Sequence, residues 1–212
     1  MATHEVVRLV SAQREQAIDV LTKAFRNDAG YRYVIPDPDE RVRSLDRFWD
    51  ALLTHCGICG EVYTTMDVRG VACWLSPGNA SPTFWQLLRT RFALPRAVMG
   101  FSKEARDRLA PLMRYNDEVH HRTVVAPHWY LGALAVDPDY QHTGVGSALL
   151  QPVLARADAS RTPCYLETQT RGNAQFYEKQ GFKVVNEGEV AGTGLTMWGM
   201  LREPRSTPGR TT

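Results

Sequence analysis

An apolar run that leads into a loop with two glycines constrains this chain more than any other feature. Residues 129–136 read Trp-Tyr-Leu-Gly-Ala-Leu-Ala-Val, and a turn, Asp-Pro-Asp, follows at 137–139. The loop at 141–146 reads Gln-His-Thr-Gly-Val-Gly, and an apolar helical pattern starts near Ser147. A short apolar run bounded by turn signals is typical of a buried strand. The order therefore predicts a strand, a turn, a glycine-rich loop and a helix.

This loop is suited to an anionic ligand. The first turn of a helix carries N–H groups without intrahelical partners, and the helix dipole makes this end positive. A phosphate group fits such a position, and glycine lets the backbone approach it closely. No Gly-Lys-Ser/Thr is present, which excludes a P-loop, and no third glycine completes a dinucleotide-binding fingerprint. An ordinary strand-to-helix turn with two glycines is the alternative at this stage.

A second segment, downstream of the loop, favours the phosphate-binding interpretation. Residues 173–182 read Asn-Ala-Gln-Phe-Tyr-Glu-Lys-Gln-Gly-Phe, and one strand-like segment at 164–168 separates them from the loop. Together, Gln-x-x-Gly-x-Gly and Asn-x-x-x-Tyr-x-x-x-Gly-Phe resemble the GNAT superfamily of acyl-CoA N-acyltransferases. More narrowly, residues 72–77, a long helical insertion and Leu-Glu-Thr at 166–168 are similar to the puromycin N-acetyltransferase group.

The resemblance implies one domain of the α/β (α+β) class over residues 1–202. We expect a GNAT-type mixed central β-sheet that is splayed at the cofactor site, with flanking helices and a helical insertion at about 82–119. Residues 203–212 are polar with Pro and Gly, and we expect a loose C-terminal tail. Strand-like patterns that fit this sheet lie at 6–10, 61–66, 71–75, 127–136, 164–168, 182–185 and 195–200.

Local signals also give boundaries. Ser11 is expected to cap the first helix, and residues 31–36 are expected to form a loop. We expect the helical insertion to break near Pro95 and Pro111, since proline disrupts a helix interior.

The resemblance also implies the acyl donor, acetyl-CoA, and the residues that would bind it. Leu134, Ala135 and Val136 would hold the pantetheine arm by strand-like pairing, while Asn173 and Phe176 would contact it from the following helix. The pyrophosphate would lie on backbone N–H groups of the loop and of the helix start, which comprise Gln141, His142, Thr143, Gly144, Val145, Gly146 and Ser147.

Two side chains are assigned catalytic roles, Tyr177 from the resemblance and Glu167 because its acceptor-only carboxylate is expected on the strand beside the cofactor strand. Tyr177 would protonate the departing thiolate as a general acid, a role that contributes about 10²–10⁴-fold to the rate. Glu167 would act as the general base, through a water molecule. The structural alternatives are a core tyrosine with a satisfied hydroxyl, and a carboxylate that pairs with an arginine.

The acceptor is expected to be a primary amine of a small molecule. An α-amino group has a pKa of about 8 and a lysine amine one of about 10.4, a gap of about 3 kcal/mol in deprotonation cost. One carboxylate base suits the more acidic amine better. No cysteine lies in the loop to form an acyl-enzyme, so we expect direct attack in a ternary complex. The alternatives are acetylation of protein or peptide amines, and a non-catalytic CoA-binding sensor.

Composition and charge limit the partners, the compartment and the metal sites that we expect for this protein. A net charge of +2 does not favour nucleic acid or a membrane, and no apolar run approaches the roughly 20 residues of a membrane span. The chain start lacks a basic-then-apolar signal, so we expect a cytoplasmic protein. Cys56 and Cys59 form a single pair, and His120, His121 and His128 lack a recognisable complementary ligand. We therefore expect no metal.

Overall fold

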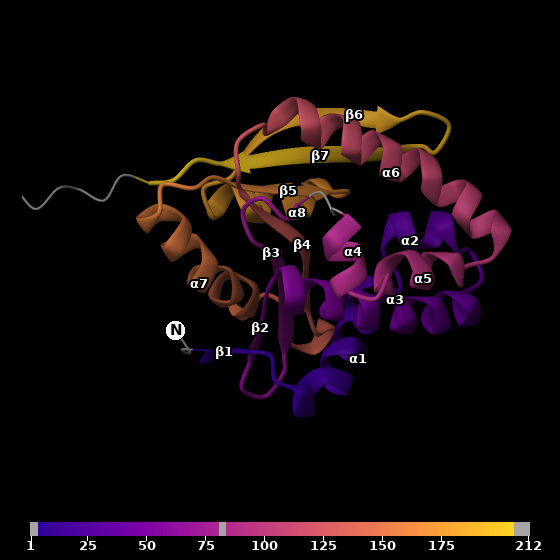
Figure 1. The fold of residues 1–212 in the computed structure, drawn as a ribbon, viewed down its shortest axis with the longest axis horizontal. Helices are drawn as coiled ribbons and strands as arrows, with labels where there is room; N and C mark the ends of the chain where they lie inside the picture. The colour runs from indigo at the N-terminus through magenta and orange to yellow at the C-terminus, as the bar shows by residue number, and fades with distance from the viewer. Residues whose placement is uncertain (1–3, 81–83, 206–212) are drawn as a thin grey trace, which may run out of the picture.

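The structure is a computed structural model that describes residues 4–80 and 84–205. A mixed sheet forms its centre, and helices flank it (Figure 1). The sheet has seven strands in the order β1-β2-β3-β4-β5-β7-β6. The strands are β1 (Val6–Arg8), β2 (Gly60–Thr65), β3 (Gly70–Leu75), β4 (Trp129–Val136), β5 (Cys164–Thr168), β6 (Lys183–Val190) and β7 (Leu195–Arg202).

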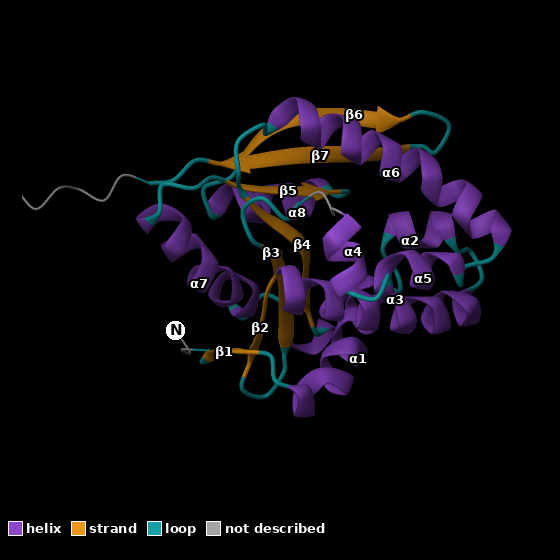
Figure 2. Ribbon diagram, in the orientation of Figure 1, coloured by secondary structure: helices purple, strands orange, loops and turns teal. Residues whose placement is uncertain are grey.

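Eight α-helices are present in the described part of the chain, and Figure 2 shows them around the strands. They are α1 (Arg14–Phe25), α2 (Ala29–Val34), α3 (Pro38–Cys59), α4 (Phe84–Arg89), α5 (Ala93–Met99), α6 (Lys103–Thr123), α7 (Val145–Ala159) and α8 (Arg171–Lys179). Two short 3-10 turns, η1 (Ser11–Gln13) and η2 (Pro138–Tyr140), complete the list. None of the described helices is long and apolar enough to cross a membrane.

The sheet opens in its middle, between β4 and β5. These strands are parallel and share only two residue pairs, Trp129 with Cys164 and Tyr130 with Tyr165, before they diverge. On its other edge β4 is bulged, because Gly132 is an extra residue between the pairs that β3 makes with Leu131 and Ala133. A bulge bends and twists its strand. The predicted mixed, splayed sheet is thereby confirmed.

Hydrophobic clusters hold helices against both faces of the sheet. On one face α7 and α8 pack through Leu149, Val153 and Ala174 against strand residues such as Trp74 and Leu166. On the opposite face α1 and α3 pack through Leu21, Trp49 and Leu53 against Val71 and Ala135. Side chains of β4 therefore pack into both hydrophobic clusters, as expected for a strand that is covered on both faces.

The predicted insertion corresponds to α4, α5 and α6, but its breaks are not at the prolines. A break lies near Pro95, at residues 90–92 between α4 and α5, but Pro95 itself lies inside α5; Pro111 lies inside α6, so the break expected there is wrong. The chain instead turns at Arg91 and Phe92, which adopt left-handed backbone angles. Pro95 lies in a first helical turn, where a missing N–H costs nothing. Around Pro111, Ala105 and Leu112 pack into one cluster, and this packing outweighs the lost bond.

Two further local expectations are wrong. Ser11 starts a 3-10 turn and accepts no capping bond; the side chain of Gln13 accepts from Val10 N at 3.3 Å instead. Residues 31–36 were expected as a loop, but α2 extends to Val34, because Asp28 Oδ1 accepts from Gly30 N and Tyr31 N at 2.9 and 3.3 Å. The expected tail at 206–212 and the expected insertion start at 82–83 lie outside the described residues.

Candidate active site

The opening between β4 and β5 brings a tyrosine and a carboxylate together. Tyr130 and Tyr165 form the last residue pair between β4 and β5. Glu167 lies two residues beyond Tyr165 on β5. The hydroxyl of Tyr130 donates a 2.8 Å hydrogen bond to Oε2 of Glu167. Successive side chains of a strand alternate between faces, so Leu166 packs with α7 and α8 while Glu167 lies on the other face.

Glu167 is poised for proton transfer near neutral pH. It is half-buried, and burial raises the pKa of its carboxyl to about 7, with a further rise from the negative charge of Asp117. Tyr130 and Tyr165 lower this pKa in part. Among the described residues, Glu167 has a tyrosine as its hydrogen-bond partner and forms no ion pair with an arginine. The structural alternative of an arginine-paired carboxylate is therefore not what the structure shows.

Tyr177 approaches β5 from the opposite face. It lies on α8, is 8% exposed, and packs edge-on against Phe176 and Phe182 with ring centroids 5.1 and 5.8 Å away. Burial raises the pKa of its phenol, so the hydroxyl keeps its proton at neutral pH. This packing suits a core tyrosine, and the retained proton suits a general acid. Glu167 and Tyr177 thus lie on opposite sides of the same strand.

The glycine loop forms the far end of the opening. Gly144 has φ +94°, a left-handed angle that favours glycine, and α7 begins at the next residue, Val145. No side chain of the described residues caps this helix start, and the first return bond comes from Ala148 N to Gly144 O at 3.0 Å. The amides of the first turn therefore face outward at an exposed loop, where an anion can accept from them.

The loop is fixed by two local hydrogen bonds and by one contact from a distant part of the chain. The hydroxyl of Thr143 donates to Tyr140 O at 2.6 Å, and Gln141 Nε2 donates to Val136 O at 3.4 Å. His4 Nε2 lies 2.9 Å from Thr143 O, so the beginning of the chain meets the loop. Sequence reasoning missed His4, because no local pattern relates residues 139 positions apart.

The loop and α8 meet at the positions that were predicted to bind the cofactor. A Cβ on Gly146 would lie 3.3 Å from Cζ of Phe176, which explains the small residue there. Gln180 Nε2 donates to Ser147 Oγ at 3.0 Å. Asn173 is exposed in the first turn of α8, where its backbone N donates to Thr170 Oγ1 at 3.1 Å.

The side chains of the predicted pantetheine strand belong to the protein core. Leu134 and Val136 pack with the α7 and α8 cluster, and Ala135 packs with the α1 and α3 cluster. What these residues offer a ligand is their backbone edge, which faces the opening and is not paired by β5.

The residues considered for metal binding do not assemble into a ligand set. Within the described residues, no group of three or more His, Cys, Asp or Glu side chains could hold a metal ion. Cys56 and Cys59 are free and buried, in the last turn of α3. His120 and His128 form a hydrogen-bonded pair beside the opening.

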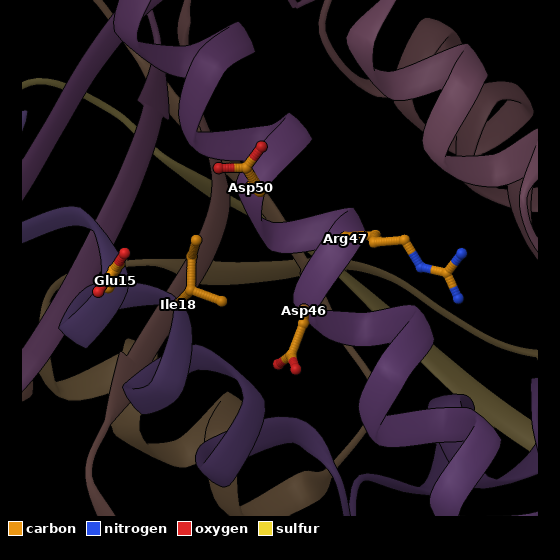
Figure 3. A pocket seen from close by; sticks show the side chains of 5 residues that line it. All are labelled: Glu15, Ile18, Asp46, Arg47 and Asp50. Carbon is orange, nitrogen blue, oxygen red and sulfur yellow. The ribbon is translucent and has the colours of Figure 1, made fainter.

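A hollow on the surface lies elsewhere, between α1 and α3. It encloses about 370 Å³ and is lined by Glu15, Ile18, Asp46, Arg47 and Asp50 (Figure 3). Its walls include no residue of β4, β5 or α8. The opening of the sheet is therefore the candidate site, because a carboxyl with a raised pKa, a protonated phenol and backbone groups without a β5 partner border it.

Known proteins are similar to this chain in sequence and in fold. Residues 110–184 match the family model described as "Acetyltransferase (GNAT) domain", an interval that contains β4, the loop, α7, β5 and α8. An uncharacterised N-acetyltransferase of Schizosaccharomyces pombe is 24% identical over 181 residues, which cover 82% of this chain and 72% of that protein.

Two solved structures extend the likeness over the whole fold. A crystal structure from Corynebacterium glutamicum, of "histone acetyltransferase HPA2 and related acetyltransferase", has a TM-score of 0.68 at 24% identity and covers 98% of this chain and 100% of that one. The structure of arylalkylamine N-acetyltransferase 2 from Aedes aegypti has a TM-score of 0.62 at 13% identity, with 96% and 100% covered.

The fold and the matched segment make this chain similar to acetyltransferases of the GNAT type. Residues 110–184 are the part of this chain that matches the GNAT domain model, and the seven-stranded sheet has the fold of the solved acetyltransferase structures. The narrower resemblance to the puromycin N-acetyltransferase group stays a prediction.

Proposed function

We propose that this protein is an acetyl-CoA-dependent N-acetyltransferase that acts on a primary amine of a small molecule, by direct attack in a ternary complex. The observation that supports it most is the opening between β4 and β5. It has Glu167 and Tyr177 on its two sides and the exposed amides of α7 at its far end.

In this proposal, the donor lies along the opening. The unpaired backbone of Leu134, Ala135 and Val136 pairs with the pantetheine arm, and Asn173 with Phe176 contacts it from α8. The pyrophosphate accepts from amides between Gln141 and Ser147. Each such contact is modest at an exposed helix start, about 0.3–1 kcal/mol, so several are needed for useful affinity.

The chemical steps then use groups from both faces. The amine nitrogen attacks the thioester carbonyl and loses a proton to Glu167 through water, while a backbone N–H of β4 polarises the carbonyl oxygen. The tetrahedral intermediate breaks its carbon–sulfur bond, and Tyr177 gives its proton to the departing thiolate. The products are the acetylated amine and free coenzyme A.

The acceptor class follows from the strength of the base. A carboxyl with a pKa of about 7 lies about one unit below an α-amino group and more than three below a lysine amine. Val34 of α2 and Leu112 of α6 also pack against Met197 of β7, so these two helices close over the end of the sheet. Both features favour a short, weakly basic amine over an extended lysine-containing peptide.

An amine panel tests the proposal. The protein is incubated with acetyl-CoA and with small aliphatic, aryl and α-amino amines, and free thiol is followed together with acetylated product. We expect thiol release with at least one low-pKa amine, and loss of it in E167Q and Y177F. Acetylation of peptides alone would favour a protein acetyltransferase. Coenzyme binding without turnover of any amine would favour a sensor.

A further inference from the structure

A layer of stacked rings lies behind Glu167. The imidazole of His120, on α6, is parallel to the ring of Tyr165 at 4.8 Å and 6°, and to the ring of Tyr130 at 5.2 Å and 17°. The two tyrosines are direct neighbours on β5 and β4. One imidazole therefore covers both phenols that interact with the carboxyl of Glu167.

The imidazole is locked by a second histidine. His120 Nε2 lies 2.8 Å from His128 Nε2, and His128 Nδ1 lies 2.8 Å from the carbonyl oxygen of Ala126. A carbonyl only accepts, so Nδ1 of His128 carries a proton and its Nε2, in the neutral ring, is an acceptor. His120 Nε2 is then the donor. Both histidines are buried, 8% and 6% exposed, and their geometry fixes one tautomer for each ring.

The outer side of the pair meets solvent. A hollow of about 200 Å³ is lined by His120, His121 and His128, together with residues 124–127 and the start of the β3–α4 connection. His120 therefore forms a wall that has this hollow on one side and the two phenols on the other. Removal of the ring would expose the two phenols to this hollow.

We propose that His120 is a positioning residue, which closes the wall between this hollow and Glu167, holds the hydroxyl of Tyr130 against the carboxylate and keeps the bulk solvent of the hollow away from it. The inference rests on the proposed role of Glu167 as the base. His120 touches neither of the reacting groups, so it acts through Tyr130 and Tyr165.

The charges around the wall are consistent with this role. Glu167 is faced by Tyr130 from β4, by Tyr165 on β5 and by Asp117 from α6. His120 is faced by His121 and His128, and burial, followed by these two neighbours, lowers the pKa of His120 to about 4. The pair is thus neutral at neutral pH. The pair therefore shields Glu167 without placing a cation beside it. A cation there would stabilise the carboxylate, lower its pKa and make it a weaker base.

The test is a direct titration of Glu167 in the full chain, without turnover. Glutamate is labelled with ¹³C at the carboxyl, the Glu167 resonance is assigned by its loss in E167Q, and its shift is followed from pH 4 to 9. We expect the midpoint to fall by roughly one pH unit or more in H120A, because water then reaches the carboxylate. H120F keeps a ring over the tyrosines and should titrate like the wild type, as should H121A, which alters the hollow but not the wall.

The variants also separate this inference from the proposed activity. An unchanged Glu167 midpoint in folded H120A would refute the proposed role of His120, whether or not the protein acetylates an amine. If H120A does not fold, H128A leaves the His120 ring without its anchor and should give a smaller shift in the same direction; an unchanged midpoint there would likewise overturn it. In an active enzyme, the acidic limb of kcat/KM should move with the midpoint.

Discussion

Tyr130 and Glu167 lie on strands that are parallel neighbours for only two residue pairs, and the phenol donates a 2.8 Å hydrogen bond to the carboxylate just where the strands separate. The bond stabilises the charged carboxylate, yet burial prevails and the pKa of Glu167 stays near 7. The carboxyl that lies where the sheet opens therefore has a pKa close to neutral pH.

Replacement of Glu167 by Gln should lower kcat by about 10²–10⁴-fold, because the amide cannot accept the proton of the amine. In the wild type, activity should decline as pH falls through about 7, where the carboxylate becomes protonated. The measurement is kcat against pH for both proteins. An acidic limb that persists unchanged in E167Q would assign that limb to another group.

The same carboxyl should also make the free energy of unfolding depend on pH, in the direction opposite to that of the activity. The folded pKa of Glu167, about 7, lies above its usual value of 4.5. Its contribution to stability is therefore complete below about pH 4.5 and is lost as pH rises through about 7. Urea unfolding of wild type and E167Q should show that E167Q gains in relative stability from pH 5 to pH 8. A constant difference would contradict the raised pKa.

Replacement of Tyr177 by Phe should separate binding from chemistry. The ring stays in its place between Phe176 and Phe182, so the Kd for acetyl-CoA should change little, whereas the departing thiolate loses its proton donor. We expect kcat to fall by about 10²–10⁴-fold. Calorimetry gives the Kd and thiol release gives kcat. Unchanged turnover would leave Tyr177 as a core tyrosine only.

Replacement of Gly144 by Ala should weaken acetyl-CoA binding. The residue has φ +94°, where a side chain costs about 1–3 kcal/mol of strain, and relief of that strain would move the amides of α7. We expect roughly a tenfold rise in Kd, about 1.4 kcal/mol. Gly172→Ala is the matched control, since a Cβ there has no neighbour within 4 Å. Equal affinities for both variants would remove the loop from the binding site.

Replacement of Asp158 by Asn should destabilise the fold without a direct effect on the site. Asp158 accepts two 2.7 Å bonds from Arg202, which is 2% exposed, so the variant leaves a buried charge unpaired. We expect a loss of about 3 kcal/mol in urea unfolding. Arg202 holds the pKa of Asp158 below its usual range, so the contribution is present above about pH 4 and is lost in more acidic solution. Asp107→Asn, in an exposed pair with Lys103, should show no measurable change.

The sheet and the loop could be predicted from the sequence because their signals are local. The apolar run of β4, the turn and Gly144 follow one another directly, and each has a physical meaning at its own position. The placement of Glu167 opposite Tyr130 depends on the register between strands 37 residues apart, which no local pattern reports. The same holds for His120, whose stacking depends on how an insertion helix packs, and for Pro111, whose helix is maintained by tertiary contacts.

The two residue pairs between β4 and β5 leave a row of main-chain groups without strand partners in the interior of the sheet. A sheet commonly loosens first at its borders, but here the hairpin of β2 and β3, with five paired positions, holds together better than the middle does. Deuterium should therefore enter the facing amides of β4 sooner than those of the hairpin. The line along which the strand pairing is interrupted therefore lies at the centre of the sheet, between β4 and β5.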